Sequence, residues 1–338
     1  MRVTAVAPVR IDLAGGWSDV PAFASREGGV VTNVTLDLCA RVECRPGGKT
    51  IRLHAADLAQ RVVAASPSDL VYDGRLDLHK AALNMLPVTG GIEIWSRSDV
   101  PPGSGLGASG ALDVALVAAL AACRQETFDP AEIAELAFRL EAVELQLDGG
   151  RQDQYAAALG GWHRFDFAES GVTVGEVPAT AEQVREFAGM LVVAYTGETH
   201  FSADTHRQVW AAYRAGRSET VEALRVIRDC GAAAAGALAR ADWRHLAAVV
   251  DENWRAQQRL DASIATPTLR RVEEAMRVAG AWGIKATGAG AGGCLVALGE
   301  PGRRDAIGRA AESAGATVFA CALSQRGVEV RRAEDDGA

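Results

Sequence analysis

The segment 101-PPGSGLGASG-110 has glycine at positions 103, 105 and 107 and leads directly into an Ala-, Leu- and Val-rich run at 108–125. Glycine lets the backbone turn sharply and approach a ligand closely. The first N–H groups of a helix that starts near Ala108 lack partners within the helix, and the helix dipole favours an anion in front of them. A helix start without a ligand stays open from this segment alone. We nevertheless predict a triphosphate-binding loop formed by Pro102, Gly103, Ser104, Gly105, Leu106, Gly107, Ala108 and Ser109.

The same segment contains the pattern G-x-G-x-x-G at 105–110, which dinucleotide-binding proteins carry between a first strand and a first helix. Its context differs from theirs, because several predicted strands precede it and Pro101 and Pro102 separate it from the strand at 91–98. The acid expected about 20 residues later would be Glu126, which follows a helix and not a second strand. No G-x-x-x-x-G-K-[ST] occurs either. The segment is therefore neither a dinucleotide fingerprint nor a P-loop.

The composition of the chain excludes several classes of partner. It has 338 residues, a formal net charge of −8 and no cluster of Lys and Arg, which disfavours nucleic acid. No apolar run approaches the roughly 18–20 residues of a membrane span, and the N-terminus lacks a signal-peptide pattern. The cysteines form no C-x-x-C pair and show no zinc spacing. We expect a cytoplasmic protein, a monomer or homodimer, without a nucleic-acid or membrane partner.

Hydrophobic patterning divides the chain into a strand-rich beginning and a more helical remainder. Strands are predicted at 2–13, 28–44, 50–55 and 91–98, with a loop at 14–23. Helices are predicted at 108–125 and 129–147, the second with Asp129 as its N-cap. The expected later elements are a strand at 190–197, helices over 203–280, strands at 293–298 and 316–323 around a helix, and a frayed tail at 331–338. This order predicts an α+β fold in two lobes.

Two more segments carry motifs, 7-APVRIDLAGGWSDVP-21 and 285-KATGAGAGGCLVAL-298. With 101–109 they resemble, in this order, the three motifs of the GHMP kinases, the family named for galacto-, homoserine, mevalonate and phosphomevalonate kinases. The third motif departs from the family pattern at Ala291, which is strained if its φ is positive. The resemblance covers essentially the whole chain. It implies a two-lobed fold with a lobe like ribosomal protein S5 domain 2 over 1–188, a ferredoxin-like lobe over 189–338, and ATP and substrate between them.

The resemblance also implies catalytic residues. In 149-GGRQDQYAAALGG-161, Asp153 matches the aspartate that serves related sugar kinases as base or electrostatic anchor for the acceptor hydroxyl. Arg10 matches the arginine that some sugar-1-kinases of the family place between acceptor and γ-phosphate, where it stabilises the transferred charge. From the residues alone, a helix N-cap for Asp153 and an ion pair between the lobes for Arg10 stay open.

A magnesium ion is expected to accompany ATP. The family pairs the loop serine, matched by Ser109, with a glutamate on the helix before the catalytic aspartate. Glu141 lies in a segment that resembles the corresponding fucokinase pattern. A buried carboxylate is costly unless it is paired or metal-bound, which also draws attention to Glu144. On the predicted helix, Glu144 shares an apolar face with Ile133, Leu136, Leu140, Val143 and Leu147. We favour Glu141 as the metal ligand and keep Glu144 open.

Substrate recognition is expected from Gly16, Trp17 and Asp19. Galactokinases carry GEHTD where this chain has GGWSD, so galactose is disfavoured, while Asp19 can accept hydrogen bonds from sugar hydroxyls. Trp17 either stacks on a sugar face or belongs to the core. Further candidates for substrate contacts are Thr196, Gly197, Thr287 and Gly288.

The acceptor is expected to be a sugar. LAGGWSD resembles fucokinases, and GRQDQYAAALGG resembles heptose-7-phosphate 1-kinases; both phosphorylate an anomeric hydroxyl. This implies an ATP-dependent sugar-1-kinase for a heptose, with or without a phosphate, or for a deoxyhexose such as fucose. His200 stands where an arginine is expected for phosphate binding, unless Arg207, Arg151 or Lys285 substitutes. A kinase for a non-sugar alcohol and a catalytically silent sugar-binding regulator stay open.

Overall fold

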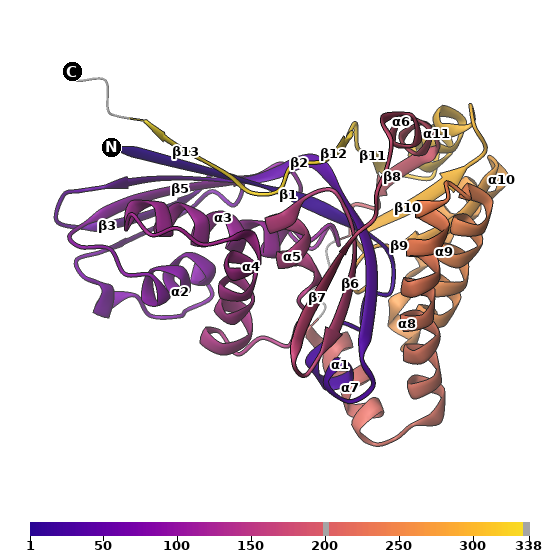
Figure 1. Cartoon of the computed structure of the whole chain (residues 1–338), viewed down its shortest axis with the longest axis horizontal. Coiled ribbons are helices and arrows are strands. Elements are labelled where there is room, and N and C mark those ends of the chain that lie inside the picture. The colour runs from indigo at the N-terminus through magenta and orange to yellow at the C-terminus, as the bar shows by residue number, and fades with distance from the viewer. Residues whose placement is uncertain (199–202, 334–338) are drawn as a thin grey trace.

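The structure is a computed structural model that describes residues 1–198 and 203–333. Within these residues the strands form two sheets, of nine and of four strands, and helices pack against both (Figure 1). The predicted α+β class and the two-lobed architecture are confirmed. None of the helices in the described residues combines the length and the apolar character that a membrane span needs.

The long strand β2 (Gly29–Pro46) organises the larger sheet, because it pairs with other strands along both edges. One edge is occupied by β1 (Arg2–Ala14), which runs antiparallel to it. The other edge is shared by β6 (Trp162–Ala168), β12 (Leu323–Ser324) and β5 (Ile92–Ser98). The sheet continues with β13 (Glu329–Ala333) beside β1, β7 (Gly171–Glu176) beside β6, and β3 (Ile51–Ala55) and β4 (Gln60–Ala64) beyond β5.

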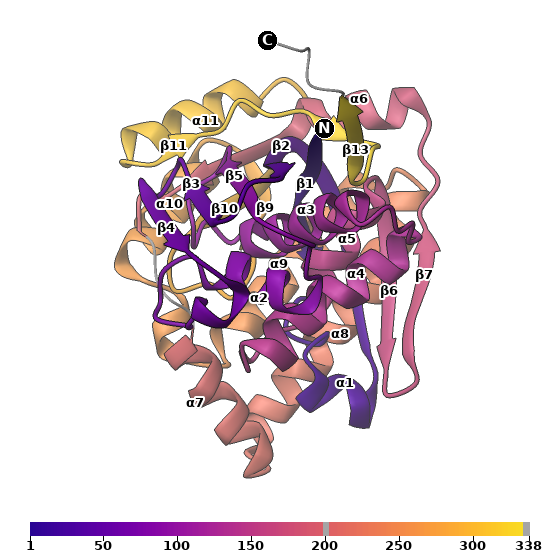
Figure 2. The same ribbon diagram turned by 90° about the vertical axis from the view of Figure 1, so that its left-hand side faces the viewer.

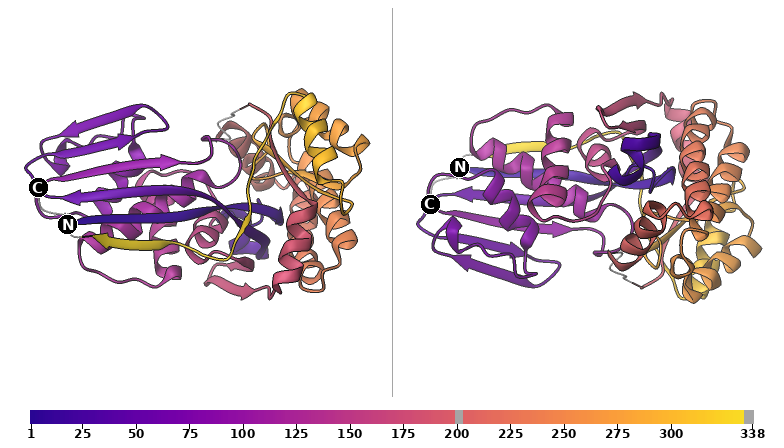
Figure 3. Two further views of the ribbon diagram at one scale, coloured as in Figure 1. Left: turned by 90° about the horizontal axis from the view of Figure 1, so that it is seen from above. Right: turned by 90° about the horizontal axis from the view of Figure 1, so that it is seen from below.

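Helices cover one face of the strands β13, β1, β2, β5, β3 and β4, and the other face is open (Figure 3). The covering helices are α2 (Asp77–Met85), α3 (Ala108–Cys123), α4 (Pro130–Arg139) and α5 (Gln152–Leu159), with the short turn η1 (Pro67–Asp69) before α2. α3 packs directly on β1 and β2 and is buried on nearly all sides. It therefore forms the centre of this lobe.

The smaller sheet is antiparallel and has the order β11-β8-β10-β9, formed by β8 (Leu191–Tyr195), β9 (Ala281–Ala286), β10 (Cys294–Gly299) and β11 (Thr317–Val318). It packs with α6 (Ala181–Met190), α10 (Pro267–Val278) and α11 (Arg304–Ser313). Two long helices, α8 (Ser218–Ala239) and α9 (Trp243–Gln258), connect the sheets, since α8 packs on β2 and α9 on β9. α7 (Ala203–Arg214) lies beside α1 (Pro21–Glu27) at one end of the molecule, and the turn η3 (Ala262–Ile264) precedes α10 (Figures 1 and 2).

Some predicted elements differ from the structure. The single strand expected at 316–323 is wrong: the chain leaves the smaller sheet after β11 and pairs with the larger one from β12 onward. The tail expected to fray from 331 pairs with β1 as far as Ala333. The larger sheet thus takes strands from both parts of the chain, and the boundary between 188 and 189 stays a prediction.

The predicted helix 129–147 changes its geometry midway. α4 begins after Asp129 as expected, with a capping box. It then continues as a π-helical turn, η2 (Leu140–Glu144), in which the Leu145 N–H donates to the Leu140 carbonyl oxygen over 3.2 Å. The wider turn rotates the following residues, so that Val143 and Leu147 are 61% and 51% exposed. The prediction that they share a buried face with Leu140 was wrong.

The close approach of α9 to β9 depends on Gly283. A methyl group there would lie 2.0 Å from the Ala247 carbonyl oxygen of α9. We expect Gly283→Ala to lower the free energy of unfolding by at least about 2 kcal/mol, because backbone must move to relieve the clash. Gly236→Ala in α8 is the control, since its methyl group meets only the end of the side chain of Arg240, the residue that follows this helix. It should raise stability by roughly 0.5–1 kcal/mol. Urea denaturation measures both; equal effects would contradict the packing argument.

Candidate active site

The two glycine-rich loops are in direct contact, although they are far apart in sequence. The Cys294 N–H donates to the Ser104 carbonyl oxygen over 2.8 Å, and the Thr287 hydroxyl donates to the Gly105 carbonyl oxygen over 3.2 Å. Gly105 has φ +77°, and a methyl group on it would lie 2.2 Å from the Thr287 carbonyl oxygen. Only glycine fits there. The structure thereby places Thr287 and Gly288 of the second loop beside the predicted phosphate loop.

Arg10 of β1 and Asp153 of α5 form an ion pair next to this loop. The Arg10 Nε and Nη2 atoms donate to Asp153 Oδ1 over 2.8 and 2.5 Å, and Nη1 donates to the Gly105 carbonyl oxygen over 2.5 Å. The Arg10 side chain is 4% exposed and that of Asp153 25%, so the carboxylate is the more open partner. Asp153 lies inside the first turn of α5, whose N-cap is Arg151, which removes the N-cap alternative. The catalytic roles of the pair stay predictions.

A second cluster of acidic groups surrounds Ser109 at the start of α3. The Glu141 carboxylate accepts hydrogen bonds from the Ser109 hydroxyl and from Gln154 Nε2, the latter over 2.7 Å. Asp113, one helical turn after Ser109, lies against Glu141, and burial raises the pKa of both carboxyl groups. Glu144 instead accepts a hydrogen bond from the Tyr72 hydroxyl at the surface. Of the two predicted metal-ligand candidates, Glu141 is the one beside Ser109.

The donor set around Ser109 suits a magnesium ion. Mg²⁺ takes oxygen ligands and usually combines one or two carboxylates with substrate phosphates and water. Glu141 and the Ser109 hydroxyl supply such oxygens, and the buried Asp113 carboxyl group hydrogen-bonds with that of Glu141. No three His, Cys, Asp or Glu side chains of residues 1–198 and 203–333 converge on one point as a metal cluster. A cation here would therefore depend partly on oxygens of a nucleotide.

Asp19 follows β1 and lies against the start of α5. Gln152 donates its backbone N–H to Asp19 Oδ2 over 3.1 Å and its side-chain Nε2 to Oδ1 over 3.3 Å. Burial raises the pKa of Asp19 to about 7; the Gln152 backbone bond opposes this rise, and the nearby carboxylates of Asp153 and Asp12 add to it. Asp19 is thus close to Asp153, as the predicted acceptor site requires, but only 3% exposed.

Trp17 lies in the core and not on an open surface. It is 4% exposed, adopts a left-handed backbone conformation with φ +83°, and stacks on His206 of α7 with ring centroids 4.4 Å apart. Burial lowers the pKa of His206 to about 4, which keeps the ring neutral. In this structure the core alternative for Trp17 therefore holds, and stacking on a sugar would require α7 to move. His200 lies outside the described residues.

The other predicted substrate residues lie around the second glycine loop. The Thr196 hydroxyl donates to the Gly293 carbonyl oxygen over 2.8 Å, which places Thr196 and Gly197 at the end of β8 against that loop. Ala291 has φ +61°, so alanine carries the strain expected for this position. Gly288 accepts a hydrogen bond from Gln257 Nε2 over 2.9 Å through its carbonyl oxygen.

Sequence reasoning did not find the buried pair formed by Lys285 and Asp12. Lys285 Nζ donates to Asp12 Oδ2 over 2.7 Å and to the Asp12 carbonyl oxygen over 3.0 Å, and neither side chain is exposed beyond 1%. The Asp12 Oδ1 atom accepts the Gly16 N–H over 3.3 Å, which holds the predicted substrate turn. Lys285 is therefore occupied and does not reach a substrate phosphate. Arg10 and Asp12 are two residues apart and therefore lie on the same face of the strand. This spacing was the one signal in the sequence that Asp12, like Arg10, is a charged side chain with a partner.

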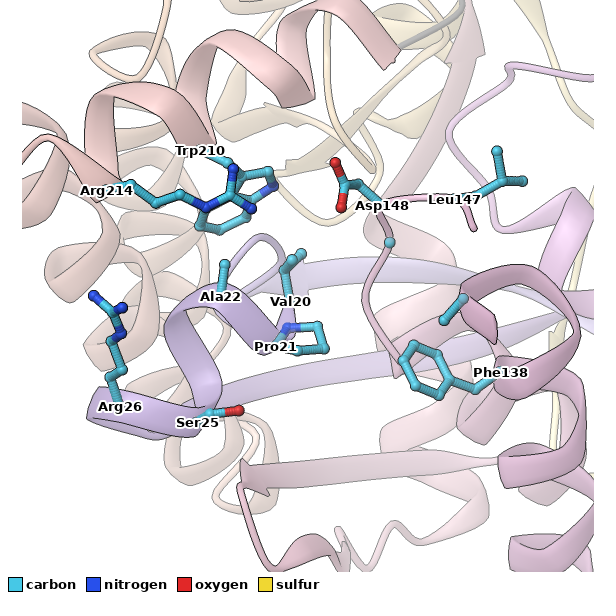
Figure 4. A pocket seen from close by; sticks show the side chains of 12 residues that line it. Val20, Pro21, Ala22, Ser25, Arg26, Phe138, Leu147, Asp148, Trp210 and Arg214 are labelled. Carbon is cyan, nitrogen blue, oxygen red and sulfur yellow. The ribbon is translucent and has the colours of Figure 1, made fainter. Parts of the chain in front are cut away.

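A cavity of about 450 Å³ lies beyond Asp19, between α1, α7 and the segment 147–149 (Figure 4). Its walls include Val20 and Phe138, with Asp148 on one side and the guanidinium groups of Arg26 and Arg214 on the other. The two arginines end α1 and α7, and neither has a carboxylate partner among the residues that the structure describes. Because Arg26 and Arg214 are far apart in the sequence and share no motif, sequence reasoning could not predict that they line one cavity.

Comparison with known proteins agrees with this geometry. Residues 73–161 match the GHMP kinases N terminal domain, and residues 219–322 match the GHMP kinases C terminal domain. The chain is 30% identical over 308 residues to the D-glycero-alpha-D-manno-heptose 7-phosphate kinase of Campylobacter jejuni, covering 88% of this chain and 89% of that protein. It is 25% identical over 315 residues to the bifunctional fucokinase/GDP-fucose pyrophosphorylase of Arabidopsis thaliana, covering 86% of this chain and 29% of that protein.

A solved structure shows the same architecture. The crystal structure of a D-glycero-D-manno-heptose 1-phosphate kinase from Bacteroides thetaiotaomicron superimposes with a TM-score of 0.82 at 25% identity, covering 98% of this chain and 100% of that one. A glycine loop at a helix start beside a carboxylate is an arrangement suited to phosphoryl transfer to a small molecule. The chain belongs to the GHMP kinase family. It is accordingly an ATP-dependent phosphotransferase with an alcohol group as acceptor.

The raised pKa of Asp19 predicts a pH-dependent stability. The unfolded chain loses this proton near pH 4, whereas the folded chain keeps it until about pH 7, so the contribution of Asp19 to stability falls as the pH rises between these values. Relative to wild type, Asp19→Asn should therefore gain about 2–3 kcal/mol of stability between pH 5 and pH 8. Urea denaturation of both proteins across this range measures the difference, and parallel curves would refute the assignment.

If Asp153 is the base, Asp153→Asn should lower kcat by about 10²–10⁴-fold, because a positioned base contributes that much to proton transfer. Binding of ATP, measured by calorimetry, should change little. Asp166→Asn is the control, since Asp166 pairs with Arg164 on β6 away from the site. A kcat close to that of wild type in Asp153→Asn would rule out a base at this position.

Proposed function

We propose that this kinase phosphorylates the anomeric hydroxyl of a sugar, either a heptose, free or phosphorylated, or a deoxyhexose such as fucose. The observation that carries the proposal is the placement of Asp153, which is bound by Arg10, adjoins the loop at 103–110 and lies near Asp19. An acceptor hydroxyl placed there would meet a base, a cationic group and the predicted phosphate site together. Support for a sugar comes from the relatives that are named as heptose and fucose kinases, the first of which is 30% identical to this chain, whereas relatives named as mevalonate kinases are 26–28% identical.

Arg10 and Asp153 would have different roles in phosphoryl transfer: Asp153 would accept a proton, and Arg10 would stabilise negative charge. Both hydrogen bonds that Arg10 donates to Asp153 are accepted by Oδ1, which leaves Oδ2 to take the proton of the acceptor hydroxyl. Arg10 is also bonded to the Gly105 carbonyl oxygen, which fixes its positive charge relative to the phosphate loop. That charge stabilises the negative charge that develops on the transferred group. Asp19 and the Gly16 turn then orient the sugar by hydrogen bonds to its hydroxyls.

ATP would lie on residues 102–109, with its phosphates facing the N–H groups that begin α3. Ser109 and Glu141 would hold the magnesium ion. Bound there, the ion would neutralise charge on the phosphate oxygens. On the other side of the acceptor, Thr196, Gly197, Thr287 and Gly288 would close the site from the second glycine loop.

The cavity beyond Asp19 favours an acceptor that already carries a phosphate. Arg26 and Arg214 line this cavity without a carboxylate partner among the described residues, so an anion bound there would neutralise positive charge. Guanidinium groups also match the geometry of a phosphate. Because Val20 lines the cavity directly after Asp19, a sugar held by Asp19 would extend its far end toward Arg26 and Arg214. These arginines would replace the charge that the sequence lacks at position 200.

An ADP-release assay over fucose, mannose, galactose, mannoheptose and mannoheptose 7-phosphate tests the proposal. We expect the highest kcat/KM with the phosphorylated heptose. Arg26→Ala combined with Arg214→Ala should raise KM for that substrate by about tenfold or more, since each charged hydrogen bond lost costs roughly 1.5–3 kcal/mol. KM for ATP should not change. Arg52→Ala, on the exposed face of β3, is the control.

The outcomes separate the remaining candidates. Turnover of a free sugar with no preference for the phosphorylated one would reject the role of the arginines but keep the sugar-1-kinase. No turnover of any sugar would reject the proposal in favour of a non-sugar alcohol or a silent regulator. The silent regulator is disfavoured because Arg10, Ser109 and Asp153 are all present and arranged in one site.

A further inference from the structure

Two cysteine side chains meet where α3 packs on β2. Cys44 lies on β2 and is completely buried, whereas Cys123 is the last residue of α3 and is partly exposed. The Cys44 thiol donates a hydrogen bond to the Cys123 sulfur. The two residues are far apart in the sequence, so this pair of thiols exists only through the fold, and phosphoryl transfer does not use it.

The register of the larger sheet explains why the two thiols face each other. Cys44 is paired with Val3 of β1, and Val3 is paired in turn with Arg332 of β13. Residues directly opposite each other on neighbouring strands point to the same face of a sheet. Here this is the face that α3 covers, because α3 packs on β1, β2 and β13. Cys44 therefore points toward α3, and Arg332 lies at the edge of the same face.

The surroundings of Cys123 favour its thiolate, which is the reactive form of cysteine. The hydrogen bond from Cys44 and the positive charge of Arg332 lower the pKa of Cys123, and burial opposes them only in part. The same hydrogen bond, together with burial, raises the pKa of Cys44. Cys123 is thus the nucleophile of the pair, and Cys44 keeps its proton.

The other partly exposed cysteines are in different surroundings. Burial raises the pKa of Cys39, and it raises the pKa of Cys321 to about 11. The Cys39 thiol donates to the Asp37 carbonyl oxygen over 3.4 Å and not to a second thiol. Cysteines that oxidise reversibly combine a low pKa, access to solvent and a neighbouring thiol. Cys123 combines all three.

We propose that Cys123 and Cys44 form an oxidation site, which hydrogen peroxide converts into a reversible disulfide between α3 and β2. The Cys123 thiolate attacks one oxygen of the peroxide, so that an S–O bond forms, the O–O bond breaks and hydroxide leaves. The Cys44 sulfur then attacks the Cys123 sulfur. The S–S bond forms, the S–O bond breaks, and the leaving hydroxide takes the Cys44 proton to become water. In sum, the two thiols lose two electrons and two protons, and the peroxide takes them up to give two water molecules.

This disulfide would protect the fold from irreversible oxidation. Without a neighbouring thiol, a sulfenic acid at Cys123 is oxidised further to a sulfinic acid, which thiols do not reduce. A sulfinate would place a charge against the apolar core around α3, where charge is costly. The site lies roughly 20–25 Å along α3 from the phosphate loop, so the inference does not depend on the proposed function.

Peptide mapping of the full chain after treatment with peroxide tests the site. The reduced protein is exposed to hydrogen peroxide, the remaining thiols are blocked with iodoacetamide, and the peptides are identified by mass spectrometry. We expect one pair of peptides joined through Cys44 and Cys123, which dithiothreitol separates again. Cys39 and Cys321 are internal controls and should be oxidised at least about threefold more slowly. A pKa that is lower by one unit raises the thiolate fraction about tenfold and lowers the nucleophilicity about threefold.

Two variants separate the roles of the two thiols. Cys44→Ala should form no disulfide, and continued exposure to peroxide should convert Cys123 to a sulfinic acid that dithiothreitol does not reverse. Cys230→Ala is the matched control, because Cys230 is also buried but lies on α8, and this variant should form the disulfide as wild type does. Oxidation should lower the melting temperature of Cys44→Ala but not that of wild type, since only the variant gains a charge against the core.

The peptide map of wild type decides the proposal even if Cys44→Ala does not fold. A reversible link between Cys44 and Cys123, formed before Cys39 and Cys321 react, supports it. Peroxide-treated wild type in which Cys44 stays a thiol while Cys123 is oxidised would overturn it. Oxidation of Cys39 or Cys321 ahead of Cys123 would overturn it as well.

Discussion

An ion pair shielded almost completely from water, between Lys285 of β9 and Asp12 of β1, joins the two lobes at the site. Losing one partner of such a pair generally costs about 3–5 kcal/mol, because the other charge remains buried. Alternate residues of a strand point to the same side. Arg10 therefore points to the same side as Asp12, and Thr287 to the same side as Lys285, which directs both toward the phosphate loop. Both reach the carbonyl oxygen of Gly105. One pair of charges thus sets the relative positions of the base, the phosphate loop and the second glycine loop.

The charges around this pair are unbalanced. Five carboxylates, two of them paired with cationic side chains, gather around the start of α3 and the end of β1: Asp12, Asp19, Asp113, Glu141 and Asp153. Such a cluster is unfavourable for folding and favourable for binding a cation and hydroxyl groups. Functional sites of natural proteins are commonly less stable than the rest of the fold, because their charged groups are arranged to bind a ligand. The large apolar core around α3 compensates for it.

The fold was predicted well wherever a segment carries one clear local pattern, such as alternating hydrophobicity, a glycine-rich turn or a helix cap. The alternating strands near the N-terminus, the glycine loop before α3 and the cap at Asp129 all lie where periodicity and capping place them. Long-range pairing was less accessible. β6 and β7 were not predicted, and β12 and β13 belong to the larger sheet because of partners about 290 and about 330 residues away, respectively. The wheel for 129–147 assumed an α-helical period and missed the π-turn at Leu140.

The candidate site shows the same division. Motifs predicted Arg10, Ser109, Glu141 and Asp153, and the structure brings these residues together, although their roles remain to be tested. Asp113, Lys285 and the two arginines of the cavity have no local pattern, because their meaning comes only from what the fold places beside them. Trp17 could not be assigned from sequence, since a ring that stacks on His206 and one that stacks on a sugar require the same residue.

The return of the chain from the smaller sheet to the larger one has a mechanical consequence. The polypeptide crosses between the lobes before β8 and crosses back between β11 and β12 (Figure 1). Two separate covalent connections resist twisting of one lobe against the other. They leave bending about the line through both connections as the soft motion. Any movement that admits a substrate should therefore be an opening and closing about that line.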